Sequence, residues 1–497
     1  MSNIRVSYAG LINFTVILIS FVTGLIFTII VTRKLSPDEF GLWSLMGSLV
    51  LYVMIFKPIN EYWTTRHIAR NEEVGTTAIA SSGLFSAGSI GIFLVVIFII
   101  SSNSNADYDI LLFSSILIPL TYISTIMLAI TAGYKPQGSG YGMLIFEITK
   151  IPIGFVLVYL ADWGIVGAIT TTSIATCIQI IFYVYYLKDK LKGRFDVKLL
   201  KNWFKLSWLS MFGATYSWIQ NLDRTIFILF SGSVAGLAYV GVATAISQLI
   251  SSSRAMSSAL YPKLIASQKE QYIELMLQRV LLIAIPLLGF TLIFAKSGLW
   301  VLNPLYVDGV SIVIIWSFSH FVQVFHTPLS SALLGLERVD IGFKSKFKDY
   351  IKSKLFFTPL VYLISYSSYI IVLIVIMHVL TQFNLQELEI IFWWGVGGTI
   401  SNIGILIAFW IKLNKQIELK FPLIHGIKYV IVTIIAFTIT LWSTKQFLVY
   451  EESIFIFLPS LIPHMLLFFG IYLPIIVLWD KATRQFLHLI INEFKSK

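Results

Sequence analysis

The sequence has a single cysteine, Cys177, among 497 residues. One thiol cannot close an internal disulfide or build a metal site by itself, which excludes a secreted disulfide scaffold. Charged residues are also scarce, at 12 % of the chain, whereas soluble domains carry about 25 %. This shortage excludes an ordinary soluble enzyme and a disordered chain.

Several functional motifs are missing as well. The sequence contains no glycine-rich phosphate loop followed by Lys-Ser or Lys-Thr and no spacing typical of metal ligands. The net charge is +11, but no loop is long enough for a basic domain that could read nucleic acid. We therefore predict a protein that is not an enzyme, has no cofactor or metal, and binds no nucleic acid.

Hydrophobic residues, in contrast, make up 57 % of the chain, enough for about fourteen spans of about 20 residues each. Spans must be helices or closed barrels, and these apolar runs are too long and continuous for barrel strands. The sequence predicts an all-α integral membrane protein, with helices at 9–31, 41–63, 76–100, 110–132, 143–160, 165–187, 203–230, 237–255, 279–297, 309–333, 355–379, 391–411, 424–443 and 454–479. The first run has span length, so we expect it to stay as an anchor.

The distribution of charge predicts the orientation. Lys and Arg gather in the loops 188–202 and 334–354 and in the C-terminal tail, which share one side under this count. Acidic pairs such as Glu451 and Glu452 lie on the other side. Because basic loops stay cytoplasmic, we predict a cytoplasmic membrane protein with both termini inside, and contacts with anionic lipids.

The basic loop also divides the chain. We predict an N-terminal six-helix lobe at 1–187, a cytoplasmic linker at 188–202, a C-terminal six-helix lobe at 203–412, and two additional helices with the tail at 413–497. Six spans per half give both halves the same orientation. Two six-helix lobes around a central polar cavity are typical of a transporter.

Polar residues near the end of the 41–63 helix form one candidate site. Lys57 and Glu61 are four residues apart and share a helix face, and Arg66 and Arg70 follow. One interpretation is a cationic site for phosphate or another anionic headgroup, since ionisable groups within spans normally face a cavity. The other is that the helix ends near Phe56 and these residues form a loop.

The 203–230 helix carries a second candidate. Tyr216, Gln220 and Asp223 share one stripe of this helix, and Arg224 lies on the neighbouring stripe. A broad polar face on a spanning helix indicates a cavity wall with substrate contact. The alternative is an Asp223–Arg224 ion pair that fixes helix packing.

Two further groups are less specific. His320 and Gln323 lie at helical spacing with His326 beside them, which suits either a proton relay or interhelical hydrogen bonding. Glu147 and Lys150 are three residues apart near a helix end. We interpret this last pair as structural, with the lysine reaching towards the interface.

Four segments together resemble one family. Residues 32–44 contain an Arg, a short acidic loop and an aromatic-glycine pair; residues 66–70 form a basic segment closing a helix. Asp223 and Arg224 are followed by Gly236 and Tyr239, and residues 261–264 contain a proline. In order and spacing these segments resemble the multidrug, oligosaccharidyl-lipid and polysaccharide exporter superfamily, in its O-antigen-flippase-like polysaccharide transporter branch.

The resemblance implies two lobes in a V around a central cavity, and transfer of a polyprenyl-linked sugar between leaflets. Cavity cations would hold the lipid (pyro)phosphate. The residues that match the family motifs are Arg33, Arg66, Arg70, Asp223 and Arg224, whereas Lys57 is added from its depth in the span. The first helix departs from some relatives because its interior has Asn13 and no Arg.

The sequence thus predicts a flippase for a polyprenyl-(pyro)phosphate-linked oligosaccharide, working by alternating access in cell-surface polysaccharide or glycan assembly. Expected partners are this lipid-linked substrate, anionic lipids and membrane proteins of glycan assembly. One alternative is a cation-coupled multidrug antiporter, which needs a carboxylate deep in one lobe. Another is a membrane polysaccharide polymerase or ligase, which needs a larger outer loop.

Overall fold

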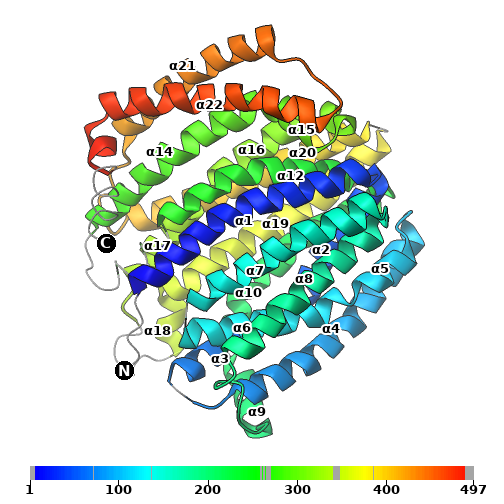
Figure 1. The fold of residues 1–497 in the computed structure, drawn as a ribbon. Coiled ribbons are helices and arrows are strands. Elements are labelled where there is room, and N and C mark those ends of the chain that lie inside the picture. The colour runs from blue at the N-terminus through cyan, green and yellow to red at the C-terminus, as the bar shows by residue number, and fades with distance from the viewer. Residues whose placement is uncertain are drawn as a thin grey trace. The chain divides into compact units, whose positions relative to one another are not determined.

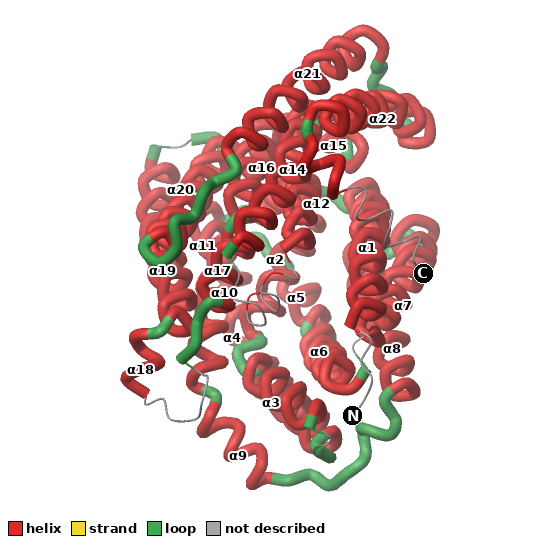
Figure 2. The backbone as a smooth tube through the Cα atoms, turned by 90° about the vertical axis from the view of Figure 1, so that its left-hand side faces the viewer, coloured by secondary structure: helices red, strands yellow, loops and turns green. Residues whose placement is uncertain are grey.

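The computed structural model describes residues 6–70, 72–135, 137–257, 260, 264, 270–339, 347–383 and 385–486. Over these ranges the regular secondary structure is entirely helical, and short loops join the helices (Figure 2). Helices satisfy their own backbone hydrogen bonds, as a hydrocarbon environment requires. The predicted all-α membrane class is confirmed.

Eleven helices within the described residues are long and apolar enough to cross a membrane. The count becomes twelve when α2 (Pro37–Val53) and α3 (Lys57–Ala69), which meet at a bend of 61°, are taken as one broken span. The chain is therefore a multi-span membrane protein. The predicted total of fourteen helices stays a prediction.

The chain forms two compact units, Met1–Gly241 with Tyr366–Ile390, and Val242–Ser365 with Ile391–Lys497. Besides α2 and α3, the first unit contains α1 (Val6–Lys34), α4 (Gly75–Asn103), α5 (Tyr108–Ser114), α6 (Leu117–Tyr134), α7 (Gln137–Gly154), η1 (Phe155–Leu160), α8 (Gly164–Tyr186), α9 (Val197–Leu206), α10 (Trp208–Gln220) and α11 (Leu222–Ser231).

The second unit contains η2 (Ser252–Ser257), α14 (Gln271–Ile293), α15 (Ala295–Leu302), η3 (Pro304–Gly309), α16 (Val310–Val324), α17 (His326–Gly335), α18 (Phe347–Lys352), α21 (Leu423–Phe447) and α22 (Ile454–Trp479). Three helices pass from one unit to the other: α12 (Ala235–Ser251), α19 (Lys354–Gln382) and α20 (Glu387–Asn414). Figure 1 labels most of the α-helices.

The start of α2 shows how the sequence shapes the first unit. Ser36 caps the helix: its hydroxyl accepts from the Glu39 amide at 3.2 Å, and the Glu39 carboxylate accepts from the Ser36 amide at 2.9 Å. This reciprocal capping box satisfies two of the amides that a helix start leaves unpaired. One turn later, Gly41 lies so close to Val234 that a Cβ at Gly41 would come within 1.8 Å of the Val234 carbonyl oxygen.

In the second unit, α21 and α22 run side by side, and α14 packs against α21 (Figure 1). Asp480, directly after α22, has a side chain that is 1 % exposed. It joins the end of α22 to the beginning of α21. Its carboxylate accepts from Tyr429 at 3.2 Å and from the Thr483 hydroxyl at 2.7 Å, and it lies 2.9 Å from His425 Nδ1. The sequence analysis did not find this buried carboxylate.

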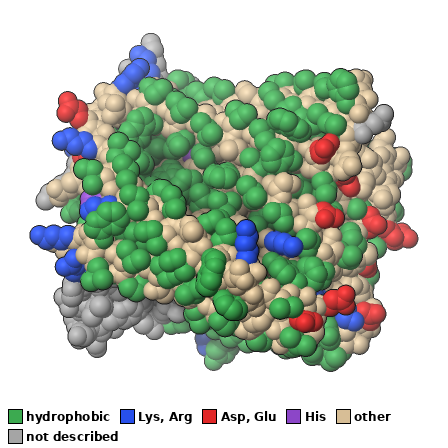
Figure 3. Space-filling view, turned by 90° about the horizontal axis from the view of Figure 1, so that it is seen from above, with side chains coloured by type: hydrophobic (Ala, Val, Ile, Leu, Met, Phe, Trp, Pro, Cys, Tyr) green, Lys and Arg blue, Asp and Glu red, His purple; other side chains and the backbone are tan. Residues whose placement is uncertain are grey.

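Charges are segregated on the face drawn in Figure 3. Lys and Arg gather mostly at one edge, Asp and Glu gather mostly at the opposite edge, and hydrophobic side chains predominate in the band between, where some Lys or Arg also lie. An apolar band between two polar edges is the surface that a membrane-spanning protein presents to a bilayer.

Several helices predicted as continuous are broken, and these predictions are corrected. The predicted 110–132 helix is divided into α5 and α6, and the predicted 309–333 helix is divided at Phe325 into α16 and α17. The predicted 41–63 helix ends at Val53, and a second helix begins at Lys57, so Lys57 is neither inside a straight span nor in a loop. Pro58 sits at the first turn of α3, where a proline costs no backbone hydrogen bond. The predicted 203–230 helix is divided at Asn221 into α10 and α11, with α9 preceding it.

Candidate functional site

Arg224 lies in the first turn of α11, just after the break at Asn221. Its Nη1 donates to the Ser44 carbonyl oxygen at 3.2 Å and to the Ser48 hydroxyl at 2.6 Å. Both acceptors belong to α2, where Ser44 and Ser48 are buried. Because they are neutral, these acceptors orient the guanidinium but do not offset its charge, whereas the adjacent Asp223 carboxylate interacts with it electrostatically.

Asp223, the neighbour of Arg224, also makes two hydrogen bonds of its own. One of its carboxylate oxygens accepts from the Arg224 backbone amide at 2.7 Å, and the other accepts from the Tyr369 hydroxyl at 3.5 Å. The carboxylate therefore stabilises the first turn of α11, where a negative charge near a helix start is favourable.

An aromatic pair lies close to this turn in the chain. The rings of Tyr216 on α10 and Tyr366 on α19 stack with centroids 6.1 Å apart and planes 14° apart. Gln220, one turn after Tyr216, is half-buried. The predicted single stripe through Tyr216, Gln220 and Asp223 is interrupted, because the helix break at Asn221 separates the first two residues from the third.

The break between α2 and α3 positions Lys57 and Glu61. The Lys57 Nζ lies 3.6 Å from Glu61 Oε1, and the two side chains are 31 % and 36 % exposed. Lys57 and Glu61 therefore share one helix face, as predicted, but this face belongs to the short helix α3. The half-exposed ammonium keeps donors for a further anion, since a lysine has three.

Arg66 and Arg70 lie at the far end of α3 and are exposed. The guanidinium of Arg66 stacks over the Tyr62 ring at 4.5 Å. Arg33 is half-buried in the last turn of α1, next to the start of α2. Arg33 and the Arg66–Arg70 pair therefore lie at opposite ends of the broken α2–α3 span and do not form one cluster.

A third cluster lies in the second unit and includes a residue that the sequence analysis missed. The Arg254 Nη2 donates to Gln323 Oε1 at 2.5 Å and lies 3.4 Å from the Ser251 hydroxyl, which is 2.8 Å from His320 Nδ1. A signal for Arg254 was present, because Ser247, Ser251 and Arg254 lie at helical spacing in a predicted span.

His326 interacts electrostatically with Arg254 of this cluster, but its hydrogen bond and ring contacts are made elsewhere. It is 3 % exposed, its Nε2 lies 2.8 Å from the Asn402 carbonyl oxygen, and Tyr362 and Phe409 place their rings against it. In these surroundings His326 joins α17 to α20.

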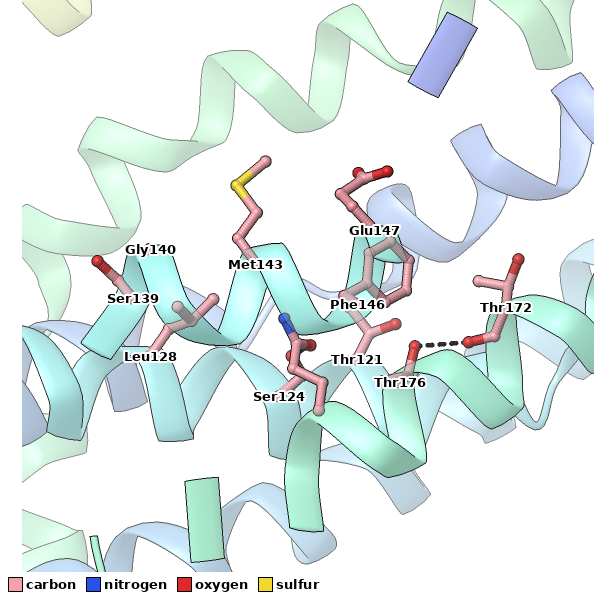
Figure 4. A pocket seen from close by; sticks show the side chains of 11 residues that line it. Thr121, Ser124, Leu128, Ser139, Gly140, Met143, Phe146, Glu147, Thr172 and Thr176 are labelled. Carbon is pink, nitrogen blue, oxygen red and sulfur yellow. Dashed lines mark hydrogen bonds between the residues drawn. The ribbon is translucent and has the colours of Figure 1, made fainter. Parts of the chain in front are cut away.

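Glu147 borders a cavity of about 580 Å³ in the first unit, between α6, α7 and α8 (Figure 4). The Lys150 Nζ lies 2.9 Å from Glu147 Oε2, and the Thr23 hydroxyl donates to the same oxygen at 2.9 Å. Both members of this predicted pair are buried. The rest of the lining combines apolar side chains, among them Leu128, Met143 and Phe146, with the hydroxyl and amide side chains of Thr121, Ser124, Ser139, Thr172, Thr176 and Gln179.

Some sequence predictions lie outside the described residues. They are the Tyr261, Pro262 and Lys263 part of the fourth motif, Lys344 and Lys346 of one basic loop, and the tail from residue 487. Among the residues that the structure describes, no three His, Cys, Asp or Glu side chains lie together as metal ligands do.

The fold is similar to that of known transporters. The lipid II flippase MurJ, in an inward closed conformation, aligns over 93 % of this chain and 98 % of its own, with a TM-score of 0.69 and 12 % identity. An inward-facing multidrug resistance MATE family transporter of the MOP superfamily covers 80 % of this chain and 95 % of its own, with a TM-score of 0.58 and 15 % identity. A MATE structure in the straight conformation covers 82 % and 95 %, with a TM-score of 0.53 and 14 % identity.

No family model matches the sequence, and a search of curated proteins found no match. Because of the structural similarities above, the chain has the fold of MOP superfamily transporters, the superfamily that its motifs resemble. This fold is shared by a lipid flippase and by multidrug transporters, so the fold alone does not distinguish between these functions.

Proposed function

We propose that this chain is a flippase that moves a polyprenyl-(pyro)phosphate-linked oligosaccharide from the cytoplasmic to the outer leaflet of the cytoplasmic membrane. Transport proceeds by alternating access and supplies cell-surface polysaccharide or glycan assembly. Both termini face the cytoplasm, and the basic loops on that side contact anionic lipids. The similarity to the lipid II flippase over 93 % of the chain supports the proposal at the level of fold.

The observation that carries the proposal is the arrangement around Arg224. A guanidinium among membrane spans is costly unless it has partners, and here its partners on α2 are the neutral oxygens of Ser44 and Ser48. A guanidinium oriented in this way still has donors for phosphate oxygens. Arg224 therefore fits an anionic headgroup better than a cationic drug.

The antiporter alternative needs a carboxylate that can exchange a cation. Glu147 is the buried candidate in the first unit, but the ammonium of Lys150 lies 2.9 Å from it. An internal ammonium at this distance neutralises the carboxylate without any external cation. This pairing favours the flippase, and it also makes Lys150 the residue whose removal would expose an antiporter site.

The test uses cells that lack the gene and express the wild type, Arg224→Gln, or Lys57→Gln with Arg224→Gln. The leaflet location of the lipid-linked oligosaccharide is measured together with the surface glycan and the amount of protein in the membrane. Lys188→Gln, which removes an exposed lysine of the basic loop, is the matched charge control.

We expect the double variant to be inserted normally and to leave the complete lipid-linked oligosaccharide on the cytoplasmic face, while the control exports normally. Normal export by the double variant would remove both cations from the site. A normal lipid distribution in gene-deleted cells, with raised sensitivity to cationic drugs, would favour the antiporter.

A further inference from the structure

The second unit has an apolar groove of about 650 Å³ that the proposed transport site does not use. Its floor is made by side chains of α14, α16 and α17 and by Phe325 between the last two helices, and Leu281, Phe325 and Leu329 are buried. Its outer wall is made by exposed side chains of α20 and α21, among them Ile407 and Ile427. Every residue that lines it is nonpolar.

Gly426 keeps the groove open on the side of α21. A Cβ at this position would meet only the Leu281 Cδ1, at 3.8 Å, which is ordinary van der Waals contact. A larger side chain at position 426 would therefore enter the groove without striking backbone. Such a missing side chain in an otherwise bulky wall suits a linear hydrocarbon chain, because a flexible methylene chain can fill a narrow apolar space.

The loop between α20 and α21 lies at one end of the groove and is basic. Trp410 and Phe421 line this end, with ring centroids 5.7 Å apart. Lys415 and Lys420 of the loop are exposed. The half-buried Lys412 places its Nζ 4.9 Å from the Phe357 ring centroid. The single acidic residue of the loop, Glu418, leaves it with a net positive charge.

An apolar groove that ends at a basic loop complements one kind of molecule in a membrane. We propose that the groove binds an acyl chain of an anionic phospholipid, and that the lysines of the loop attract its headgroup. Each lysine near a membrane surface raises affinity for anionic lipid about fivefold. A phospholipid is the occupant because it is abundant in the bilayer, and neither the groove lining nor this loop offers the hydroxyl groups that would hold a glycan.

The first test fills the groove. Native mass spectrometry of the purified full-length protein is titrated with phosphatidylglycerol, phosphatidylcholine or a polyprenyl phosphate. We expect one phosphatidylglycerol to bind more tightly than the other lipids, and Gly426→Leu to weaken that binding at least tenfold. Gly470→Leu is the matched control, since Gly470 on α22 is exposed and a Cβ there meets nothing within 4 Å.

The second test removes the charge. Lys415→Gln with Lys420→Gln should weaken phosphatidylglycerol binding about 25-fold, as expected for two lysines, and leave phosphatidylcholine binding unchanged. Lys198→Gln with Lys201→Gln, on α9 of the other unit, is the control for lost charge and should bind as the wild type does.

Three results would overturn the proposal. They are equal phosphatidylglycerol binding by the wild type and Gly426→Leu, equal binding of the charged and neutral phospholipids, and tighter binding of the polyprenyl phosphate. A thermal melt of each variant shows that it is folded. Gly426→Leu should melt no lower than the wild type, because leucine is the better helix former.

Discussion

The Arg224 Nη1 lies 2.6 Å from the Ser48 hydroxyl oxygen, which joins the first turn of α11 to the middle of α2. The same nitrogen also reaches the Ser44 carbonyl oxygen one turn earlier on α2. One guanidinium thus touches two successive turns of a neighbouring helix. This contact fixes the position of a positive charge within the spans and involves only one of the three guanidinium nitrogens.

Arg224 should act through both the charge and the planar shape of its guanidinium. Arg224→Gln removes a charge-assisted contact with phosphate, which is worth about 1.5–3 kcal/mol, so export should fall about 10- to 100-fold. Arg224→Lys keeps the charge but loses the planar fork of donors, so it should recover only part of the activity. The rate of appearance of lipid-linked sugar in the outer leaflet measures this. Full activity of Arg224→Gln would contradict the assignment.

Exchanging the two residues, as Asp223→Arg with Arg224→Asp, tests whether the pair is only structural. The exchange keeps the composition but moves the guanidinium by one residue, about 100° around the helix, away from Ser44 and Ser48. We expect export to be lost and membrane insertion to be normal. Retained export in the same assay would show that an ion pair in either order is sufficient.

Gly41 should be intolerant of any side chain. A Cβ there would lie 1.8 Å from the Val234 carbonyl oxygen, so Gly41→Ala must displace backbone. We expect a loss of about 1–3 kcal/mol, as for overpacked cores, seen as a lower melting temperature and less protein in the membrane. Gly47→Ala on the same helix, where a Cβ meets nothing within 4 Å, should be as stable as the wild type.

Replacing His320 distinguishes a proton relay from a role in helix packing. Its ring bonds the Ser251 hydroxyl at 2.8 Å, and a glutamine amide can replace that hydrogen bond. We therefore expect His320→Gln to transport with the wild-type dependence on pH, measured in vesicles with an imposed pH gradient. A flattened pH profile with normal insertion would instead identify His320 as a proton carrier.

Asp480 should make the fold sensitive to acid. Burial alone would raise the pKa of its carboxyl, but hydrogen bonds from Thr483 and His425 outweigh burial and hold the pKa below the usual value. Because the folded-state pKa is lowered, this stabilisation is fully present above about pH 4 and is lost as the pH falls through the folded value.

Asp480→Asn should therefore lower the melting temperature at neutral pH and reduce its further fall in acid. Removing one partner of a buried charged network costs about 3 kcal/mol. Asp189→Asn, which alters an exposed pair with Lys192 at 3.5 Å, is the control and should change neither. An unaltered melting profile for Asp480→Asn would mean that this network contributes nothing to stability.

Hydropathy was sufficient to predict the helical membrane class, because each span must carry its own run of apolar residues. It was not sufficient to predict the breaks. The bend before Lys57 and the interruption at Asn221 occur inside apolar runs, where tertiary contacts decide the backbone. The capped start of α2 was signalled by Ser36 and Glu39, whose spacing is a local pattern.

The candidate site was only partly accessible from the sequence. Depth in a span identified Lys57 and Arg224, since ionisable groups are rare there. The partners Ser44 and Ser48 could not be assigned, because they lie about 180 positions away and ordinary serines occur throughout the spans. Arg254 was missed because its position near the end of a predicted helix placed it beside a basic loop.

The most direct test of the central claim is the leaflet location of the lipid-linked oligosaccharide in cells from which the gene is deleted. The account predicts that the complete lipid-linked oligosaccharide accumulates on the cytoplasmic face, and that wild-type protein but not the Lys57→Gln, Arg224→Gln variant restores its transfer. A normal distribution between the leaflets in the deleted cells would contradict it.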